Sequence, residues 1–581
     1  MSESKDQTAR WEPLALENKP SWVLPSPFEM YAPGRYYGAD WGPQPVTLSE
    51  MGMYELSWTL RSKPEWQRKA ADAEIRAKWR AEAVEQLEAA DADPEKSLDE
   101  SLMTHKMVDY VLAELDDYAK IADNDRGIER ACFEAIWYSD RLVSDDLIQR
   151  LKSAAKALED VPDAQKDWHP GSNGQVLDLV HPSLYCTVYG RTHAYLPGKP
   201  RTADNFLPVC KPEGDQTEWT SPDFCWLPSD FIIDSSGIAT LASGYINNLN
   251  PAQHAPLYRV IEEVLTAFVP MFERVLGDTN REGGRKPLSD SGRMEEIECL
   301  WGPNGRAEPE EDPGSDDDED EFFEKFYATL DKFIPDANEY AGQLQDRFKP
   351  VNLRGQTVQC IIKLANIHLT PEKPDYAGGS WHVEGMTNEN IVASGIFYYD
   401  EENITESKLA FRVPMAEPPY HMQDDTECMR VLYGMGRDED LVRDIGAVVT
   451  KAGRALSWPN LFQHCVSAFK LADPTKQGHR KILAIFLVDP TKDRIVSATD
   501  VPPQQAEWAA EAFAEARAAP TSLLGRLPQE LCDLVEDYLR EAVMTLEEAK
   551  AYRLKLMKER TTFVDNHTKT VYRKTFNMCE H

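Results

Sequence analysis

The sequence predicts an α+β protein whose core is a double-stranded β-helix, a jelly-roll or cupin-like barrel, with large helical additions before and after it. Two observations lead to this prediction. After residue 354, eight short apolar segments follow one another, separated by turn-forming residues, and such a succession of strands is what a jelly roll needs. On both sides of this region the apolar residues recur at helical spacing instead.

The composition indicates a folded protein and limits its partners. The chain has 581 residues, of which 42% are hydrophobic, and its net charge is −36. A charge of this sign argues against binding the nucleic-acid backbone. No apolar stretch is long enough for a membrane span, and the N-terminus lacks the pattern of a secretory signal. We therefore expect a small-molecule substrate, no nucleic-acid partner and no membrane; protein partners are not predicted.

The ten cysteines are scattered and include no Cys-x-x-Cys pair. This spacing suits neither a disulfide framework nor a zinc ribbon, and it is typical of reduced thiols. We expect a cytoplasmic protein.

The N-terminal half divides into four expected segments. Residues 1–62, rich in proline and aromatic side chains, form an extended arm, and residues 63–160 form a helical module. Residues 161–306 mix short strand-like runs, such as Val176–Val180, with a helix near 256–276. Residues 307–321 are almost entirely acidic, so like charges repel and a disordered loop is expected; their spacing does not match a calcium-binding EF-hand loop.

Residues 322–502 form the expected jelly-roll core, and residues 503–581 return to helices. A polar insertion at 418–440, which contains His421, could cover the site. The eight strands predicted in the core are 357–369, 381–385, 391–399, 408–413, 445–450, 454–458, 463–471 and 480–488.

The candidate metal ligands are His382, Glu384 and His464. His382 and Glu384 are two residues apart in the second predicted strand, and this spacing places both side chains on one face. With 12 histidines and 99 acidic residues in the chain, about two such triplets are expected by chance. The order along the chain is more informative, because the pair comes early in the core and His464 falls in the seventh strand. Two histidines and one carboxylate with open positions opposite them are the facial triad of non-haem Fe(II) oxygenases.

Arg480 opens the last predicted strand. An arginine inside the barrel can bind a carboxylate through paired, charge-assisted hydrogen bonds, so Arg480 is the candidate anchor for a 2-oxo acid. Lys363, on the first strand, is the alternative anchor. Asn366, on that same strand, is a further candidate for cofactor binding. Asn366 and His368 could line the pocket or be hydrogen-bonded polar groups of the core.

A resemblance to a known family supports this interpretation. The stretch Gly378-Gly-Ser-Trp-His-Val-Glu-Gly385, then Pro459-Asn-Leu-Phe-Gln-His464, then Gly478-His-Arg-Lys-Ile-Leu-Ala-Ile-Phe-Leu-Val-Asp-Pro490 resembles the large, mostly fungal family catalogued as domain of unknown function 4246. The core of that family is similar to the iron- and 2-oxoglutarate-dependent oxygenases, which implies the double-stranded β-helix, Fe(II), 2-oxoglutarate as cosubstrate and O2. The chain departs from the commonest oxygenase pattern in carrying Glu384 where aspartate is more usual, and Arg480 lies farther from His464 than usual.

The function expected from the sequence is therefore an Fe(II)/2-oxoglutarate-dependent dioxygenase. It would oxidise a C–H bond of a small molecule, such as an amino acid or a secondary metabolite, and release succinate and CO2. Two alternatives stay open. The same triad could serve a cupin-like or hydrolytic metalloenzyme with another metal, for which Arg480 is not required. The chain could also be a catalytically inactive jelly-roll scaffold or binding protein.

Overall fold

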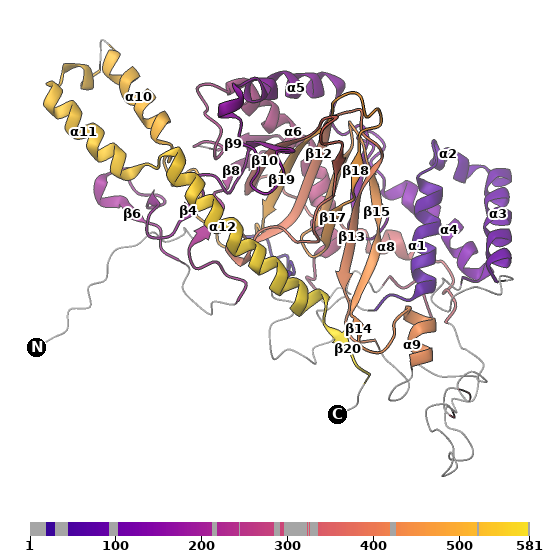
Figure 1. Ribbon diagram of the computed structural model, residues 1–581. Coiled ribbons are helices and arrows are strands. Elements are labelled where there is room, and N and C mark those ends of the chain that lie inside the picture. The colour runs from indigo at the N-terminus through magenta and orange to yellow at the C-terminus, as the bar shows by residue number, and fades with distance from the viewer. Residues whose placement is uncertain are drawn as a thin grey trace, which may run out of the picture.

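The computed structural model describes residues 19–28, 45–91, 103–211, 218–242, 244–283, 291–295, 322, 325, 335–418, 426–519 and 522–578. It has the predicted α+β character. A large antiparallel sheet and a smaller one occupy the middle of the molecule, and helices from both ends of the chain lie around them (Figure 1).

The main sheet has nine strands, all paired antiparallel. Its order is β1 (Glu129–Arg130), β2 (Trp137–Ser139), β16 (Ala455–Pro459), β12 (Ile391–Glu402), β19 (Gly478–Val488), β10 (Thr357–Leu369), β8 (Ser229–Ile233) and β9 (Ala239–Leu241), with β3 (Val176–Val180) also paired to β10. The longest strands, β10, β12 and β19, form its centre.

A second sheet has the order β15 (Val442–Thr450), β13 (Ser407–Pro414) and β17 (Gln463–Val466). The segment from β11 (Asp375–Tyr376) to His382 runs antiparallel to the segment from His464 to β18 (Phe469–Lys470), through the β11–β18 pair and a single bridge between His382 and His464. The second sheet therefore continues toward the segment that contains His382 and Glu384.

The central strands of the main sheet are buried on both faces, which explains why β19 is apolar almost throughout. Leu483, Ile485 and Leu487 belong to a core shared with helix α6 (Ala255–Thr279). The alternate residues, among them Phe486, belong to a core shared with the second sheet. Helix α6 packs so closely that a Cβ atom added to Gly395 on β12 would lie 2.8 Å from the ring of Phe268. The space between the two sheets is hereafter called the interior.

The N-terminal helices lie beside the sheets (Figure 1). They are α1 (Leu48–Arg61), α2 (Trp66–Ala71), α3 (Ala73–Asp91), α4 (His105–Ile121) and α5 (Asp145–Glu159). The predicted irregular arm is thus wrong for 48–61, where Thr47 caps a regular helix by accepting a hydrogen bond from the backbone of Glu50. The rest of the helical module is interrupted by β1 and β2, which extend the main sheet.

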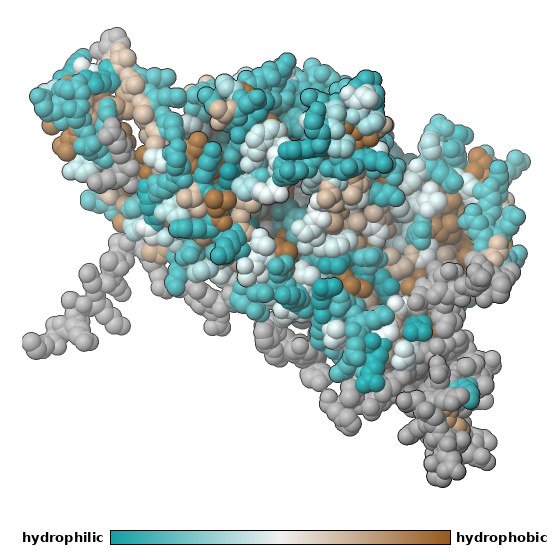
Figure 2. Space-filling model, viewed as in Figure 1, coloured by the Kyte–Doolittle hydropathy of each residue, from teal (hydrophilic) through white to brown (hydrophobic). Residues whose placement is uncertain are grey.

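The C-terminal region is helical, as predicted. It contains α10 (Ala506–Ala518), α11 (Gln529–Ala542) and α12 (Leu546–His567), and the helical path continues as a π-turn over Thr568–Tyr572. Figure 1 shows α12 crossing the front of the molecule and the α10–α11 pair projecting from it. Hydrophobic residues are visible on this projection in Figure 2, where Leu531, Leu534 and Tyr538 are exposed. None of the described helices is long and apolar enough to cross a membrane.

Seven of the eight predicted core strands are present. Strand 357–369 has the predicted bounds, the others differ at one or both ends, and the predicted strand 463–471 is divided into β17 and β18. The predicted strand 381–385 is wrong, since only His382 forms a bridge there. The acidic loop 307–321 and His421 lie outside the described residues, and the described end of the 418–440 insertion contains α9 (Thr426–Tyr433) and β14 (Glu439–Asp440). The remaining short elements are α8 (Gln343–Arg347), β4 (Thr187–Val188), β5 (His193–Tyr195), β6 (Phe206–Pro208), β7 (Phe224–Cys225), β20 (Thr575–Phe576) and single 3-10 turns at Asp163–Gln165, Ala203–Asn205, Thr387–Glu389 and Leu524–Arg526.

Candidate functional site

The structure brings His382, Glu384 and His464 together at the edge of the second sheet. The backbone N–H of His382 donates to the carbonyl of His464 at 3.3 Å, and the N–H of His464 donates back at 3.0 Å. Glu384 lies two residues beyond this bridge. The expected convergence of the three side chains is present, although it comes from one bridge and a following turn rather than from a regular strand.

The three side chains present their donor atoms to a common point. The Nε2 atoms of His382 and His464 lie 3.6 and 3.4 Å from Oε1 of Glu384, and the two ring centroids are 4.4 Å apart. One potential ligand atom from each residue lies within 4.8 Å of the others. Two imidazoles and one carboxylate arranged in this way can take three positions around one divalent cation and leave the others open.

Local hydrogen bonds orient two of these side chains. Nδ1 of His382 lies 2.8 Å from the carbonyl oxygen of Ser380, to which it donates, so Nε2 keeps its lone pair for a metal. The side chain of Asn460 accepts from the N–H of Glu384 at 2.8 Å and donates to its carbonyl at 2.9 Å. Gly385 follows with φ +70°, and a Cβ there would lie 2.9 Å from Ile391. The two hydrogen bonds of Asn460, hereafter the Asn460 clamp, and the turn at Gly385 both hold Glu384 in place.

The electrostatics of the triad favour an ionised carboxylate. Burial by itself would raise the pKa of Glu384, but the close contacts of its carboxylate with both imidazoles hold that pKa well below its usual value. Burial, with the neighbouring His382, lowers the pKa of His464. Burial opposes the charged form of His382 as well, but contact with Glu384 leaves the pKa of His382 raised. Neutral histidine and ionised carboxylate are the forms that bind a metal.

Arg480 lies on β19 and faces the interior, on the same side of that strand as Phe486. It is only 1% exposed. Its guanidinium donates to Oγ of Ser407 at 2.7 Å and stacks 4.6 Å from the ring centre of Phe469. Among the described residues, no carboxylate forms an ion pair with it. A buried guanidinium without a counter-ion is costly, so this site is suited to an anionic ligand.

Polar atoms around Arg480 also lack partners. Nε of Arg480, the hydroxyl of Tyr398 and Oε2 of Glu401 are buried and make no hydrogen bond within the described part of the chain. Glu401 is the cross-strand neighbour of Arg480 but does not pair with it, and burial raises the pKa of Glu401. Because buried polar groups are nearly always hydrogen-bonded, this cluster has the character of a site that a polar ligand completes.

The other predicted site residues on β10 lie on opposite faces of the strand. Lys363 shares the interior face with Ile361, whereas Asn366 faces outward. Asn366 donates to Glu159 of α5 at 2.8 Å and accepts from the hydroxyl of Tyr399 at 3.1 Å. The prediction that Asn366 binds a cofactor is therefore wrong, because the pleat turns this residue toward α5.

A second cluster was not anticipated from the sequence. His169, Asp178 and His181 also place potential ligand atoms within 4.8 Å of one another. Nδ1 of His169 lies 2.8 Å from Asp178, and the two imidazole centroids are 5.1 Å apart. The available signal was a charged residue in the middle of the apolar strand Val176–Val180, but no sequence pattern connects it to His169.

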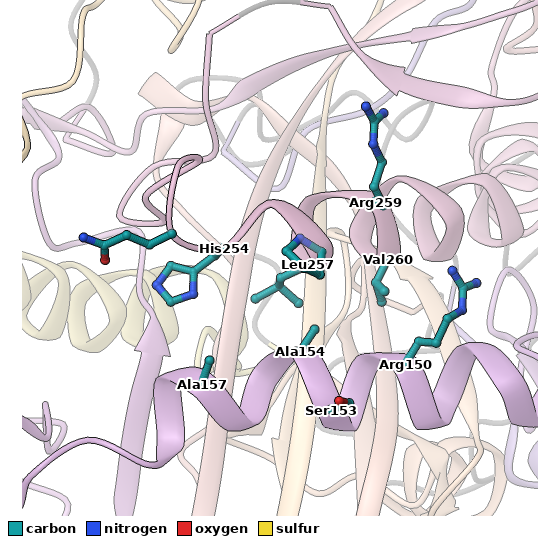
Figure 3. Close-up of a pocket in the computed structure, with 10 residues that line it drawn as sticks. Arg150, Ser153, Ala154, Ala157, His254, Leu257, Arg259 and Val260 are labelled. Atoms are coloured by element: carbon teal, nitrogen blue, oxygen red, sulfur yellow. The ribbon is translucent and has the colours of Figure 1, made fainter. Parts of the chain in front are cut away.

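A pocket of about 410 Å³ lies elsewhere, between α5 and α6 (Figure 3). His254, Arg150 and Arg259 reach it beside apolar residues such as Leu257 and Ala154. Since α6 covers the outer face of the main sheet, the sheet separates this pocket from the triad. It has no set of converging catalytic groups.

No curated protein matches the chain significantly. Among solved structures, the chain is similar to "Selenomethionine labeled Fe(II)/(alpha)ketoglutarate-dependent dioxygenase TqaL", with 8% identity, a TM-score of 0.24 and coverage of 61% of this chain and 80% of that one. It is also similar to "IDO from Bacillus thuringiensis", with 8% identity, a TM-score of 0.15 and coverage of 26% and 67%.

Family models give a direct assignment. The model described as "Protein of unknown function (DUF4246)" matches residues 105–512. The model described as "Domain of unknown function DUF4246, N-terminal" matches residues 8–82. The two matches cover both the region of the triad and the first helices, and the chain therefore belongs to the DUF4246 family.

Proposed function

We propose that this protein is an Fe(II)- and 2-oxoglutarate-dependent oxygenase that oxidises a C–H bond of a small molecule. One observation carries the proposal: a buried arginine, Arg480, which has no counter-ion among the described residues, faces the same interior as a set of two histidines and a glutamate. A metal site alone is compatible with many activities. A metal site together with a separate binding place for a carboxylate is the combination that a 2-oxo acid cosubstrate requires.

We further propose that the two sheets form a double-stranded β-helix. The order β16-β12-β19-β10 in one sheet and β15-β13-β17 in the other supports this. Within these two runs, neighbouring strands are distant in the sequence, as they are when a long hairpin is wound into a barrel. The strands before β10 and beyond β16 then extend one sheet.

His382, Glu384 and His464 would hold the metal on one side, so that the open positions face the interior. Bound there, Fe(II) with 2-oxoglutarate would use O2 to oxidise a substrate C–H bond while the 2-oxoglutarate is converted into succinate and CO2. The hydrogen bond from His382 to Ser380 and the Asn460 clamp on Glu384 keep the ligand set in place when the metal leaves.

Arg480 would bind the distal carboxylate of 2-oxoglutarate, with the hydroxyls of Ser407 and Tyr398 beside it. The strand register places Arg480 at a suitable distance from the triad. Arg480 contacts Ser407 on β13, whereas His464 pairs with Phe411 on the same strand. Four residues of strand are about 13 Å, which leaves room between the two sites for a short dicarboxylic acid and the arginine side chain.

The test is an assay of succinate formation from 2-oxoglutarate with added Fe(II) in air. Wild type should turn over, and His382→Ala and Arg480→Ala should each lose at least about tenfold, while His254→Ala and Arg259→Ala serve as matched controls in the remote α5–α6 pocket. Loss in Lys363→Ala with retention in Arg480→Ala would move the anchor to Lys363. Absence of turnover with any metal, together with no anaerobic Fe(II) binding, would refute the proposal and favour a hydrolytic metalloenzyme or an inactive scaffold.

A further inference from the structure

A second group of charged and polar side chains lines the interior beside the triad. It consists of His169, Asp178, His181 and Lys363, which we call the polar wall. In the β3–β10 pair, Asp178 lies opposite Ala365 and Val180 opposite Leu364, so His181 comes next to Lys363. Lys363 and Ala365 alternate with the outward-facing residues of β10 and thus share the interior face with Ile361.

Two charged side chains of the polar wall, Asp178 and Lys363, keep unused hydrogen-bonding capacity within the described chain. The side chain of Asp178 is only 1% exposed, and its Oδ1 atom makes no hydrogen bond there. Its Oδ2 accepts from His169 at 2.8 Å, and the nearest guanidinium, Arg553, stands 3.9 Å away and binds Asp167 with both terminal nitrogens. Lys363 makes no hydrogen bond or ion pair with any described residue. The positive charge of Lys363 nevertheless contributes to lowering the pKa of Asp178.

Lys363 and Asp178 do not pair with each other, although they lie on one face. Their Cα positions differ by two residues of strand, or about 7 Å along the sheet. Among the described residues, Oδ1 of the buried Asp178 therefore lacks a hydrogen-bond donor, and the partly buried ammonium of Lys363 lacks an acceptor. A small ligand that carries both an anionic and a cationic group can supply both.

The histidines of the polar wall disfavour a metal ion as the occupant. Nδ1 of His181 accepts from the backbone N–H of Ser183 at 3.2 Å. Burial lowers the pKa of His181 to about 3, so its ring is neutral and Nε2 carries a hydrogen. Nδ1 of His169 is engaged by Asp178, and the charges of Arg553 and Lys363 oppose a divalent cation. The polar wall thus offers hydrogen-bond donors and one acceptor, and not the three free lone pairs that a metal ion would need from these side chains.

Lys363 lies near both the rest of the polar wall and the triad. The charge of Lys363 acts on His181 on one side and on His382 on the other. His382 and His169 are partly exposed, with 37% and 25% of their side chains accessible, so both groups can be reached from solvent. By contrast Arg480, paired in register with Ile367, lies four residues farther along the sheet than Lys363.

We propose that the polar wall binds the substrate and that the substrate is a small zwitterion, of which a free α-amino acid is the simplest form. Lys363 binds its carboxylate and Asp178 its ammonium, and the two imidazoles complete the hydrogen bonds. This inference rests on the proposed function, because it takes the triad as the reacting centre. It assigns the two interior cations to different anions: Arg480 to the cosubstrate and Lys363 to the substrate.

The test measures binding and metal chemistry separately on the full-length protein. Calorimetric titration with a panel of α-amino acids is carried out anaerobically, with and without Fe(II) and 2-oxoglutarate. Each amino acid that binds is compared with its N-acetyl and its carboxamide derivative. The variants are Asp178→Asn and Lys363→Met, with the exposed Lys408→Met as the control, and circular dichroism checks their fold.

We expect at least one free amino acid to bind, both derivatives to bind at least about tenfold more weakly, and both wall variants to lose affinity by at least about tenfold. Lys363→Met should lose discrimination between the acid and its carboxamide, and Asp178→Asn between the amine and its N-acetyl form. Binding of all three forms alike, or of no amino acid while Fe(II) and 2-oxoglutarate bind, would overturn the inference and leave the proposed function intact. Amino-acid binding by the wall without Fe(II) or 2-oxoglutarate binding would support the zwitterion site and refute the oxygenase.

Discussion

The backbones of His382 and His464 hydrogen-bond to each other in both directions, and this single bridge places their imidazole centroids 4.4 Å apart. The two residues are separated by five strands of the chain, β12 to β16, yet the bridge makes them direct neighbours. Glu384 reaches both rings because it follows the bridge by two residues. The bridge therefore sets the geometry of the whole ligand set, and several measurable consequences follow from it.

Replacement of any triad residue by alanine should weaken Fe(II) binding by more than about 100-fold, because changes to residues that only orient metal ligands already cost 10- to 100-fold. Anaerobic titration followed by metal analysis measures this. His479→Ala is the matched control, since His479 pairs with Asp400 on the outer side of β12. Unchanged Fe(II) affinity in His382→Ala and Glu384→Ala would exclude the triad as the metal site.

Asn460→Ala should reduce Fe(II) affinity by about 10- to 100-fold without removing a ligand. Asn460 is buried and bonds to both backbone groups of Glu384, so its loss frees Glu384 and leaves buried polar groups unpaired, at a cost of about 1–3 kcal/mol in the free energy of unfolding. Fe(II) titration and urea denaturation measure the two effects. A loss of stability with normal Fe(II) affinity would show that the clamp serves folding alone.

Arg480→Met should bind 2-oxoglutarate at least about 100-fold more weakly and yet be as stable as wild type, or more stable, without ligand. The buried guanidinium has no described counter-ion, and removal of an unpaired buried charge relieves its desolvation cost. At a concentration 100 times its Kd, 2-oxoglutarate should add about 2.7 kcal/mol of stability to wild type only. Denaturation curves with and without 2-oxoglutarate test this; a strongly destabilised ligand-free variant would indicate a structural role.

The free energy of unfolding should fall as the pH decreases from about 6.5 to about 4, in part because of His567. Burial among Phe28, Trp219 and Phe563 lowers the pKa of His567 to about 4. The unfolded chain therefore binds a proton in this window that the folded chain does not, and stability rises with pH there and levels off above 6.5. The contribution is about 3 kcal/mol.

His567→Phe keeps an aromatic ring in this cluster and should flatten that part of the pH profile. Urea denaturation at several pH values between 4 and 7 measures the slope. An identical slope in His567→Phe and wild type would assign the acid sensitivity to other groups.

Much of the fold could be predicted because its signals are local. The apolar runs of β10, β12 and β19 and the periodicity of α6 and α12 reflect burial of each element by itself. The strand expected at 381–385 was wrong for a physical reason. His382 gains its partner from a segment about eighty residues away, and Gly385 turns the chain with a positive φ directly afterwards, so no ladder can continue.

The site was predictable only where order along the chain carries information. His382, Glu384 and His464 were found because their positions within a run of strands restrict where they can lie. Asn366 was misassigned because the choice between the two faces of β10 depends on what covers each face. Here Glu159 of α5 accepts a hydrogen bond from the side-chain amide of Asn366. The polar wall was missed because β3 joins the sheet from outside the predicted core.

The sequence by itself determined the character of the elements, the family and the chemical types of the metal ligands, since these depend on residue identity and local spacing. Only the tertiary structure decided that Arg480 is buried with no counter-ion in the described part of the chain, and that Lys363 and Asp178 share a face without pairing. These relations depend on long-range strand register. A shift of one residue would turn each of these side chains to the other side of its sheet.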